Sequence, residues 1–247
     1  ELAAAAQERL STAGRRALSR LDFGSAARLL ERAAALGPAS EVDLSLETDL
    51  IDALTGTNIN EALRRARSVS ERSAAADDRV GQLCGRIHEA VLRISVEPAG
   101  AADALEALVV EALPVFEAAG DELALRIAYR ALGSVANMRA HMDRMAAAYE
   151  QAAAYSAPAG GTALVGYQGH ARFHGSTPGT ELLAWLDEQD PREQRTYWLR
   201  TFRMTALAML GRIDEGRALL DELRAELIER GARTVLAQIA AQELGAP

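Results

Sequence analysis

Two histidines four residues apart are the first candidates for chemistry in this chain. His170 and His174 lie in GTALVGYQGHARFHGSTPG, residues 161–179, and on a helix they would share one face, as zinc ligands do. A zinc site needs a third and a fourth ligand, and none stands at a supporting spacing. The glycines form neither a phosphate-binding loop, which ends in Gly-Lys-Ser/Thr, nor a dinucleotide-binding turn, which follows a strand. We therefore predict no metal site here, but a short, glycine-loosened helix and a turn at Pro178 that bends the regular stacking.

The single cysteine is the only candidate for a thiol nucleophile. Cys84 precedes His88 by four residues, but no third group is evident to orient that base, as nucleophilic catalysis requires. We predict that Cys84 is a small core residue. His88-Glu89 lacks the second histidine of a metalloprotease helix, and acidic pairs such as Asp77-Asp78 are typical of solvated helix caps. The sequence thus predicts no catalytic residue, no cofactor and no enzyme activity for this segment.

The composition favours a thin-layered helical protein. The chain has 247 residues and a net charge of −8, with 49% hydrophobic but only 4% aromatic residues. An apolar fraction made mostly of alanine and leucine suits helices packed closely at small residues better than one thick core. All 27 basic residues are arginine, and without a basic stripe we expect no direct nucleic-acid binding. Neither a run of ~20 apolar residues nor a secretory signal is visible, and a lone cysteine cannot form an internal disulfide. We expect a cytoplasmic protein that does not bind a membrane.

Turn residues divide the chain into a succession of predicted helices, and no segment alternates with period two long enough to predict a strand. The predicted helices span 2–20, 22–36, 41–55, 58–74, 78–96, 101–119, 121–139, 141–156, 160–173, 178–188, 191–210, 212–230 and 232–244.

One pattern returns in the second helix of several pairs. LDFGSAARLLERAAALGP, residues 21–38, is echoed from Thr57, Ala140 and Gly211. In each segment an apolar residue follows the turn, a small or adaptable residue comes three positions later, and an apolar residue follows four beyond it. The small or adaptable residues are Ala26, Ala62, Met145 and Gly216. We predict that they mark contact points between helices, where larger side chains would force the layers apart.

These features resemble the tetratricopeptide repeat, a helix-turn-helix unit of about 34 residues. The first unit matches the signature at Leu10, Gly14, Phe23, Ala26, Leu30, Ala33 and Pro38, and a fourth unit at Tyr129, Leu132 and Gly133. The resemblance implies an all-α fold, an α-solenoid of antiparallel helix pairs wound into a right-handed superhelix. It implies a single domain over 1–247, with about six pairs and a final unpaired helix.

A narrower resemblance covers most of the chain from about residue 80. ALPVFEAAGDELALRIAYRALGSVANMRA, ARFHGSTPGTELLAWLDE and ALAMLGRIDEGRALLDELRAELIERG are similar to the helical repeat region that follows the ATPase module in bacterial STAND signal-transduction ATPases. Those proteins often carry a class III nucleotide cyclase domain or a LuxR-type helix-turn-helix. The chain starts at Glu1 without methionine and stops just after a helical segment, so we expect a fragment of a larger multidomain protein. The resemblance implies a non-catalytic sensor and interaction arm of a bacterial signalling or transcriptional regulator.

The tetratricopeptide resemblance also implies a binding surface, because the first helices of successive pairs line a concave groove that binds peptides or protein domains. The matching positions are Glu8, Ser11, Arg15, Leu18 and Ser19 in the first unit, and Ile127, Arg130, Ser134, Asn137 and Met138 in the fourth. From them we take Arg15, Ser19, Arg130, Ser134 and Asn137 as the candidate contact residues.

Two interpretations of Arg130 stay open. Arg130 and Asn137, seven residues apart, share a helix face and could clamp a carboxylate or a backbone amide; alternatively, Arg130 pairs with an acidic residue of a neighbouring repeat. Tyr197 and Trp198 are predicted to belong to the core between repeats. We expect the partner to be a peptide, a protein or an adjacent domain of the same chain. The alternative ligand is a small-molecule inducer held within the superhelix, which a closed pocket with convergent arginine and aromatic groups would favour.

Overall fold

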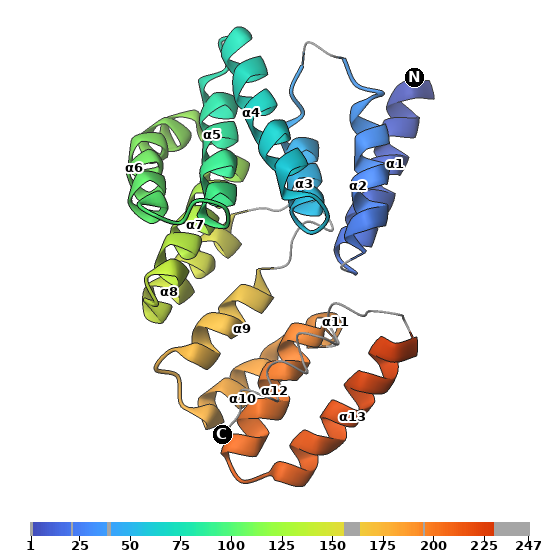
Figure 1. Ribbon diagram of the computed structural model, residues 1–247, viewed down its shortest axis with the longest axis vertical. Coiled ribbons are helices and arrows are strands. Elements are labelled where there is room, and N and C mark those ends of the chain that lie inside the picture. Colours follow the sequence, from blue (N-terminus) through green and yellow to red (C-terminus); the bar gives the residue numbers. More distant parts are fainter. Residues whose placement is uncertain (1, 21, 39–40, 156–163, 195, 230–247) are drawn as a thin grey trace. The chain divides into compact units, whose positions relative to one another are not determined.

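The computed structural model describes residues 2–20, 22–38, 41–155, 164–194 and 196–229. These residues form twelve helices of ten or more residues and one helical turn of four, and they contain no strand, so the all-α prediction is confirmed (Figure 1). The helices are α1 (Leu2–Leu18), α2 (Phe23–Ala34), α3 (Leu44–Thr55), α4 (Ile59–Ala75), α5 (Arg79–Ile94), α6 (Ala101–Ala119), α7 (Glu122–Met138), α8 (Met142–Ala154), α9 (Val165–His174), α10 (Gly179–Glu188), α11 (Pro191–Gln194), α12 (Tyr197–Met209) and α13 (Ile213–Glu229).

The predicted segments match these helices, with one exception. The single helix predicted over 191–210 is wrong, because the segment forms two helices: α11 ends at Gln194 and α12 begins at Tyr197. Thr196 stands between them with an extended backbone (φ −66°, ψ 145°), a conformation typical of a residue that precedes a helix. The predicted helix over 232–244 lies outside the described residues.

Side-chain caps explain why five helices of the first unit, α2 to α5 and α7, begin where the turn residues predicted. A carboxylate or amide oxygen accepts a hydrogen bond from the backbone N–H three residues later, which satisfies one of the donors that a helix start leaves unpaired. The capping residues are Asp22, Asp43, Asn58, Asp78 and Asp121, with N···O distances of 2.9–3.2 Å. Helix boundaries in this chain are therefore set largely by local chemistry.

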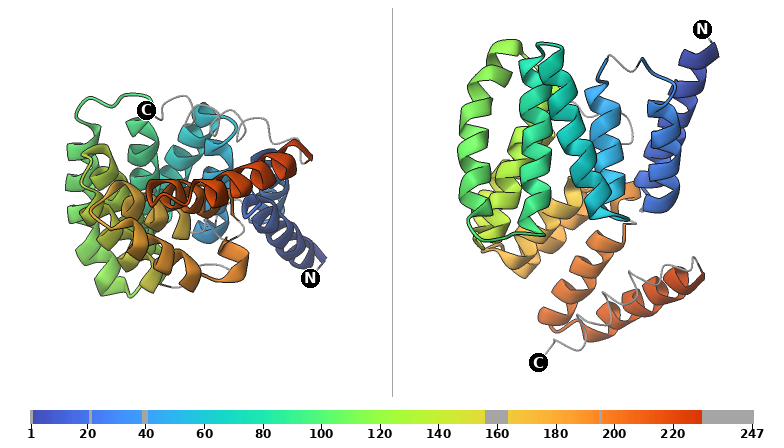
Figure 2. Two further views of the ribbon diagram at one scale, coloured as in Figure 1. Left: turned by 90° about the horizontal axis from the view of Figure 1, so that it is seen from below. Right: turned by 45° about the horizontal axis from the view of Figure 1, so that its top comes forward.

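The helices group into two compact units, Glu1–Leu164 and Val165–Pro247. In the first unit every helix packs mainly on its neighbours along the chain, and α1, α3, α5 and α7 also contact one another in turn (Figures 1 and 2). In the second unit α9, α10 and α13 all pack on α12. Packing between sequential neighbours is the arrangement of helical repeat proteins. The single domain over 1–247 stays a prediction.

Small residues lie where the helices approach most closely. Ala26, Ala62 and Met145 are buried, and at Gly216 an added Cβ would lie 2.7 Å from the Met204 carbonyl oxygen of α12, so the predicted contact point is confirmed at Gly216. Close approach is also seen at Gly133 of α7, where an added Cβ would lie 2.5 Å from the Tyr149 ring of α8. A larger side chain at such a place would push the paired helices apart.

The remaining core predictions also hold. Cys84 is fully buried, and burial raises the pKa of its thiol well above the ordinary value, which suits an inert core residue. Trp198 packs on the core of the second unit beside Phe202, and Tyr197 packs on the small core of α13. Among the described residues, none of the helices combines the length and apolarity needed to cross a bilayer.

Candidate binding surface on the first helices

The structure places the five predicted contact residues on α1 and α7 or next to them. Ser19 follows α1, is exposed, and donates to the Arg16 carbonyl oxygen at 3.0 Å. Ser134 donates to the Arg130 carbonyl oxygen at 3.3 Å, one turn earlier on the same helix. Asn137 is exposed at the end of α7. Asn137 is therefore open on the surface, and the hydroxyls of Ser19 and Ser134 bond only to the backbone of their own helix or its end.

Three other groove positions that the resemblance implies are not on the surface. Leu18 and Ile127 are buried apolar residues, and Ser11 is buried and donates to the Gln7 carbonyl oxygen at 2.8 Å. Their inclusion was wrong because the tetratricopeptide register places a residue on a helix face without fixing how far a neighbouring helix covers that face.

Arg15 joins α1 to α3. Its Nε donates to Asp49 Oδ2 at 2.6 Å, and its Nη2 donates to Ser45 Oγ at 2.9 Å. The Asp49 side chain is only 5% exposed, whereas that of Arg15 is 19% exposed. Burial raises the pKa of Asp49 although Arg15 opposes that rise. The pair therefore presents its guanidinium, and hardly its carboxylate, to solvent.

Arg130 joins α7 to α3. Its Nη2 lies 3.2 Å and 3.1 Å from the two carboxylate oxygens of Asp52, 78 positions earlier in the chain. Both side chains are about one-fifth exposed. The interpretation that Arg130 pairs with an acidic residue of another repeat is confirmed, although the acid lies two helix pairs away rather than one.

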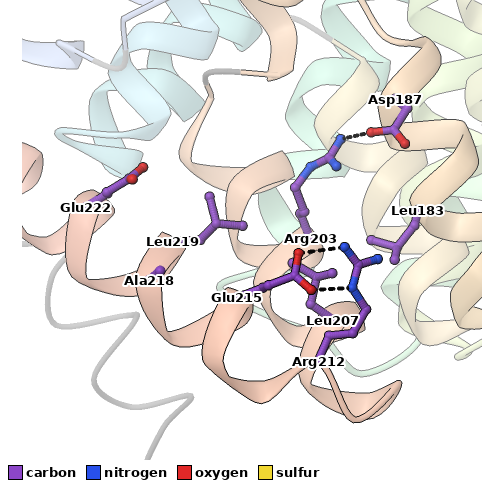
Figure 3. A pocket seen from close by; sticks show the side chains of 9 residues that line it. All are labelled: Leu183, Asp187, Arg203, Leu207, Arg212, Glu215, Ala218, Leu219 and Glu222. Carbon is purple, nitrogen blue, oxygen red and sulfur yellow. Dashed lines mark hydrogen bonds and ion pairs between the residues drawn. The ribbon is translucent and has the colours of Figure 1, made fainter.

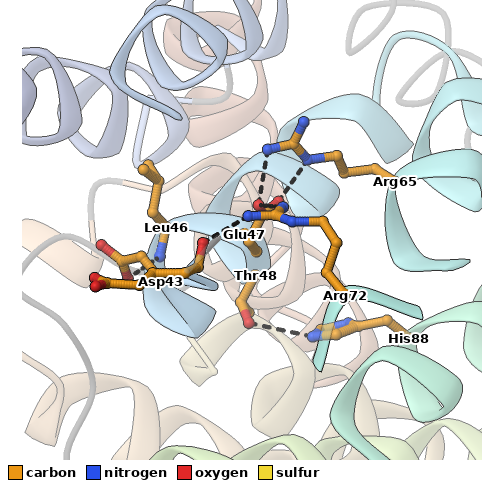
Figure 4. Close-up of polar contacts among 8 residues, drawn as sticks. Asp43, Leu46, Glu47, Thr48, Arg65, Arg72 and His88 are labelled. Carbon is orange, nitrogen blue, oxygen red and sulfur yellow. Dashed lines mark hydrogen bonds and ion pairs between the residues drawn. The ribbon is translucent and has the colours of Figure 1, made fainter. Parts of the chain in front are cut away.

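Between these two pairs α5 contributes a buried histidine. His88 lies 3.2 Å from Thr48 Oγ1 of α3 through its Nε2 (Figure 4). Burial lowers the pKa of His88 to about 4, and Arg130 adds to the effect while Asp52 opposes it. The ring is therefore neutral at pH 7 and acts as a hydrogen-bonding core residue.

A third arginine of this region supports the fold. Arg126 lies one turn before Arg130 and is nine-tenths buried. Its Nη1 donates to the carbonyl oxygens of Ala152 and Tyr155 at 3.1 Å and 3.4 Å, and so satisfies backbone acceptors at the C-terminus of α8. Burial lowers its pKa, and neighbouring Arg130 lowers it further.

Together these residues form what we call the first-helix cluster, since its members come from the first helices of four successive pairs. The first-helix cluster consists of Arg15, Asp49, Asp52, His88, Arg126 and Arg130. Its accessible groups are two arginines and one aspartate, which offer hydrogen-bond donors and acceptors to a polar chain. The cluster holds no arrangement of nucleophile, base and oxyanion donors.

Sequence reasoning missed the contribution of α3. Glu47, Thr48, Asp49 and Asp52 lie on this helix, and the first three are buried. Next to Thr48, Glu47 accepts bidentate hydrogen bonds from Arg65 and a further one from Arg72 (Figure 4). The signal was present as three acids within an otherwise leucine-rich helix, LSLETDLIDALT, because buried acids are seldom left without partners.

The second unit offers a different kind of cavity. An open cleft of about 390 Å³ lies between α10, α12 and α13 (Figure 3). His170 and His174 have ring centroids 4.4 Å apart, but the described residues contain no group of three or more His, Cys, Asp or Glu that could hold a metal ion.

Comparisons with protein-family models, with curated proteins and with solved structures each give no match. The tetratricopeptide and STAND resemblances therefore rest on sequence pattern. To that pattern the described structure adds an all-α array of helices packed mostly on their neighbours in sequence.

Proposed function

We propose that the Glu1–Leu164 unit is a non-catalytic interaction module, a right-handed tetratricopeptide-like solenoid that binds a peptide or protein segment along its first helices. The observation that carries this proposal is the first-helix cluster. It gathers accessible charges of both signs, Arg15, Asp52 and Arg130, from α1, α3 and α7 onto one surface. A polypeptide offers carboxylates, amines and amides in a row, and such a surface can pair with all of them.

The pairs within the cluster also suggest how binding could be transmitted. A partner carboxylate that takes Arg130 from Asp52 removes a direct link between α3 and α7. Helices that lose such a link can shift relative to one another, and a repeat array passes small shifts along its length. By analogy with the STAND proteins, we propose that this unit is the sensor arm of a cytoplasmic bacterial regulator, and that curvature changes bias a neighbouring ATPase or output domain.

The alternative is a small-molecule inducer bound to the same kind of regulator. It calls for a closed pocket with convergent arginine and aromatic groups. The cleft of the second unit has two arginines, but it is open and none of its lining residues is aromatic. These features favour the polypeptide ligand over the inducer.

A peptide array tests the proposal. Blocked peptides of mixed sequence are screened against the full chain, and the best binder is titrated against Arg130→Gln, Asn137→Ala and Arg139→Gln. Arg139 serves as the control, because it pairs with Asp103 and Glu106 of α6 outside the cluster. We expect Arg130→Gln to weaken binding by about tenfold, as loss of a contact residue typically does, Asn137→Ala to weaken it less, and Arg139→Gln to leave it unchanged. Equal affinity in all variants, or no binder at all, overturns the proposal. Circular dichroism verifies that each variant is folded.

A further inference from the structure

The cleft of the second unit is built by stripes of residues on three helices. α10 contributes Leu183 and Asp187, and α12 contributes Arg203 and Leu207. In each pair the spacing is four residues, so both side chains face the same way. An apolar residue and a charged residue thus stand side by side on each of these two helices.

The α13 wall has a longer stripe. Glu215, Ala218, Leu219 and Glu222 follow one another at i, i+3, i+4 and i+7 along the helix and line the cleft (Figure 3). The two acids are separated by about 10 Å along the axis, at 1.5 Å per residue. The exposed Ala218 lies between them, and a small residue at that place lets another backbone come close.

The charges of the cleft are unequal. Arg203 pairs with Asp187 at 2.7 Å, and Arg212 pairs with Glu215 through two contacts of 2.7 Å and 2.6 Å. The side chain of Glu222 is 72% exposed, and its contact with Arg200 is 3.9 Å long. The two arginines of the cleft are thus each held by a carboxylate, and Glu222 adds a further accessible negative charge.

Two of the three wall helices, α10 and α13, extend this acidity beyond the cleft, whereas α12 carries Arg200 and Arg203 and no acidic residue. α10 has three acidic residues and no basic one, and α13 has six acidic residues against two arginines. The acidic residues of α10 and α13 outnumber the arginines of all three helices, so a positively charged partner would be attracted to the α10 and α13 walls, and an acidic one repelled.

We propose that this α10–α13 cleft binds an amphipathic helix of a partner protein, with aliphatic side chains on one face and arginine or lysine beside them. The aliphatic side chains pack on Leu219 and on the edges of Leu183 and Leu207, which are otherwise buried, and a basic side chain pairs with Glu222. The volume lies near the lower end of ligand pockets, ~300–1,000 Å³, and the cleft is open, so it holds side chains of a larger partner rather than enclosing a small molecule. A helix laid into the groove between two others is an established mode of recognition.

This site goes beyond the interaction proposed for the first unit. Its residues all belong to Val165–Pro247, whereas the first-helix cluster belongs to Glu1–Leu164. The two proposals therefore fail or succeed separately, and Arg130→Gln should leave binding in the α10–α13 cleft unchanged.

A designed peptide tests this proposal on the full chain. The probe is a blocked, fluorescein-labelled, alanine-based helix of about four turns, with leucines spaced four residues apart and flanking arginines. Two control peptides carry glutamate in place of arginine, or serine in place of leucine. Fluorescence anisotropy should show binding of the probe, weaker binding at high salt because its ion pairs are screened, and no binding of either control.

Paired variants locate the binding. Ala218→Trp fills the cleft and should lower the affinity for the probe by about tenfold or more, the loss expected when a central contact is blocked. Ala184→Trp, an exposed residue on α10 that does not line the cleft, should have no effect. Glu222→Gln should weaken binding by about twofold to fivefold, as for an exposed ion pair, and Asp221→Asn should not.

Three results would overturn the proposal: no binding of the arginine probe, equal binding of the glutamate peptide, or an unchanged affinity in Ala218→Trp. A fourth would assign the cleft to a second copy of the chain instead. In that case sedimentation velocity would show a dimer that Ala218→Trp dissociates, and the peptide would not bind.

Discussion

The buried histidine of α5 makes the stability of the first unit depend on pH. His88 is surrounded by α3 and α7 and hydrogen-bonded to Thr48, and its pKa falls from 6.5 to about 4 because burial disfavours the charged ring. In the unfolded chain the same ring titrates at its ordinary value. Below that value the unfolded state binds a proton that the native state does not, and this difference drives unfolding.

The sign and size of the effect follow from that difference. Above pH 6.5 the His88 ring is neutral in both the folded and the unfolded chain, so the free energy of unfolding does not depend on it there. The free energy of unfolding decreases as the pH falls from 6.5 towards about 4. At about 1.4 kcal/mol per unit, the total loss is about 3 kcal/mol, of which about 2 kcal/mol is lost between pH 7.5 and pH 5. Asp49 acts in the opposite direction, because its raised pKa lets the native state take up a proton earlier than the unfolded chain.

A variant separates the histidine from these other groups. His88→Gln keeps a polar amide near Nε2 and removes the titration. Urea unfolding at pH 7.5 and pH 5 should show the wild type losing about 2 kcal/mol more than His88→Gln between the two values. Far-UV circular dichroism is the readout, because Trp185 and Trp198 both lie in the second unit and tryptophan fluorescence would follow that unit.

The control is the exposed histidine of the turn before α8. His141→Gln makes the same substitution at a position open to water and should retain the pH dependence of the wild type. If the wild type and His88→Gln lost the same stability between pH 7.5 and pH 5, the assignment of His88 as a neutral buried ring would be refuted.

Two further predictions concern helix packing and the buried carboxylate of α3. Gly85→Ala would place a Cβ 2.5 Å from the Ser70 backbone nitrogen and should destabilise the protein by about 1–3 kcal/mol through overpacking. Gly24→Ala would place a Cβ with nothing within 4 Å and should stabilise the protein by about 0.5–1 kcal/mol. Thermal unfolding of both variants tests this, and equal shifts in the melting temperature would contradict the packing argument. Glu47→Gln breaks the bidentate pair with Arg65 and should lower the free energy of unfolding by about 2–4 kcal/mol, since it leaves the partly buried arginine charge without its carboxylate. An unchanged urea midpoint would contradict a stabilising role of these ion pairs.

The sequence predicted what local chemistry decides. At Asp22 and Asp121 the carboxylate accepts a hydrogen bond from the backbone N–H three residues later, and this bond fixes the start of the helix. Because both groups are close in sequence, such starts can be predicted from the sequence alone. The break at Thr196 was missed because the residues on either side continue an acceptable helical pattern. Helix continuity at such a point depends on the packing of the segment, which the local pattern does not contain.

The candidate site was predicted only by half. Two of its three arginines were found, because the tetratricopeptide register places Arg15 and Arg130 on the first helices, and Arg126 was missed. Their partners, Asp49 and Asp52, were missed because the pairing spans 34 and 78 positions. No periodicity links residues so far apart, and only the succession of α1, α3, α5 and α7 in the folded unit brings them together.

The place of α3 in the first unit joins these observations. Its carboxylates are held from both sides, Glu47 by arginines of α4, and Asp49 and Asp52 by arginines of α1 and α7. A buried acid that loses its partner is costly, but an arginine that exchanges one carboxylate for another keeps its charge paired throughout. Of these links, the one between Asp52 and Arg130 has both side chains partly open to water. We therefore propose that a polypeptide carboxylate competes there at the lowest cost, and that α3 then loses its link to α7 while its pairs with α1 and α4 remain.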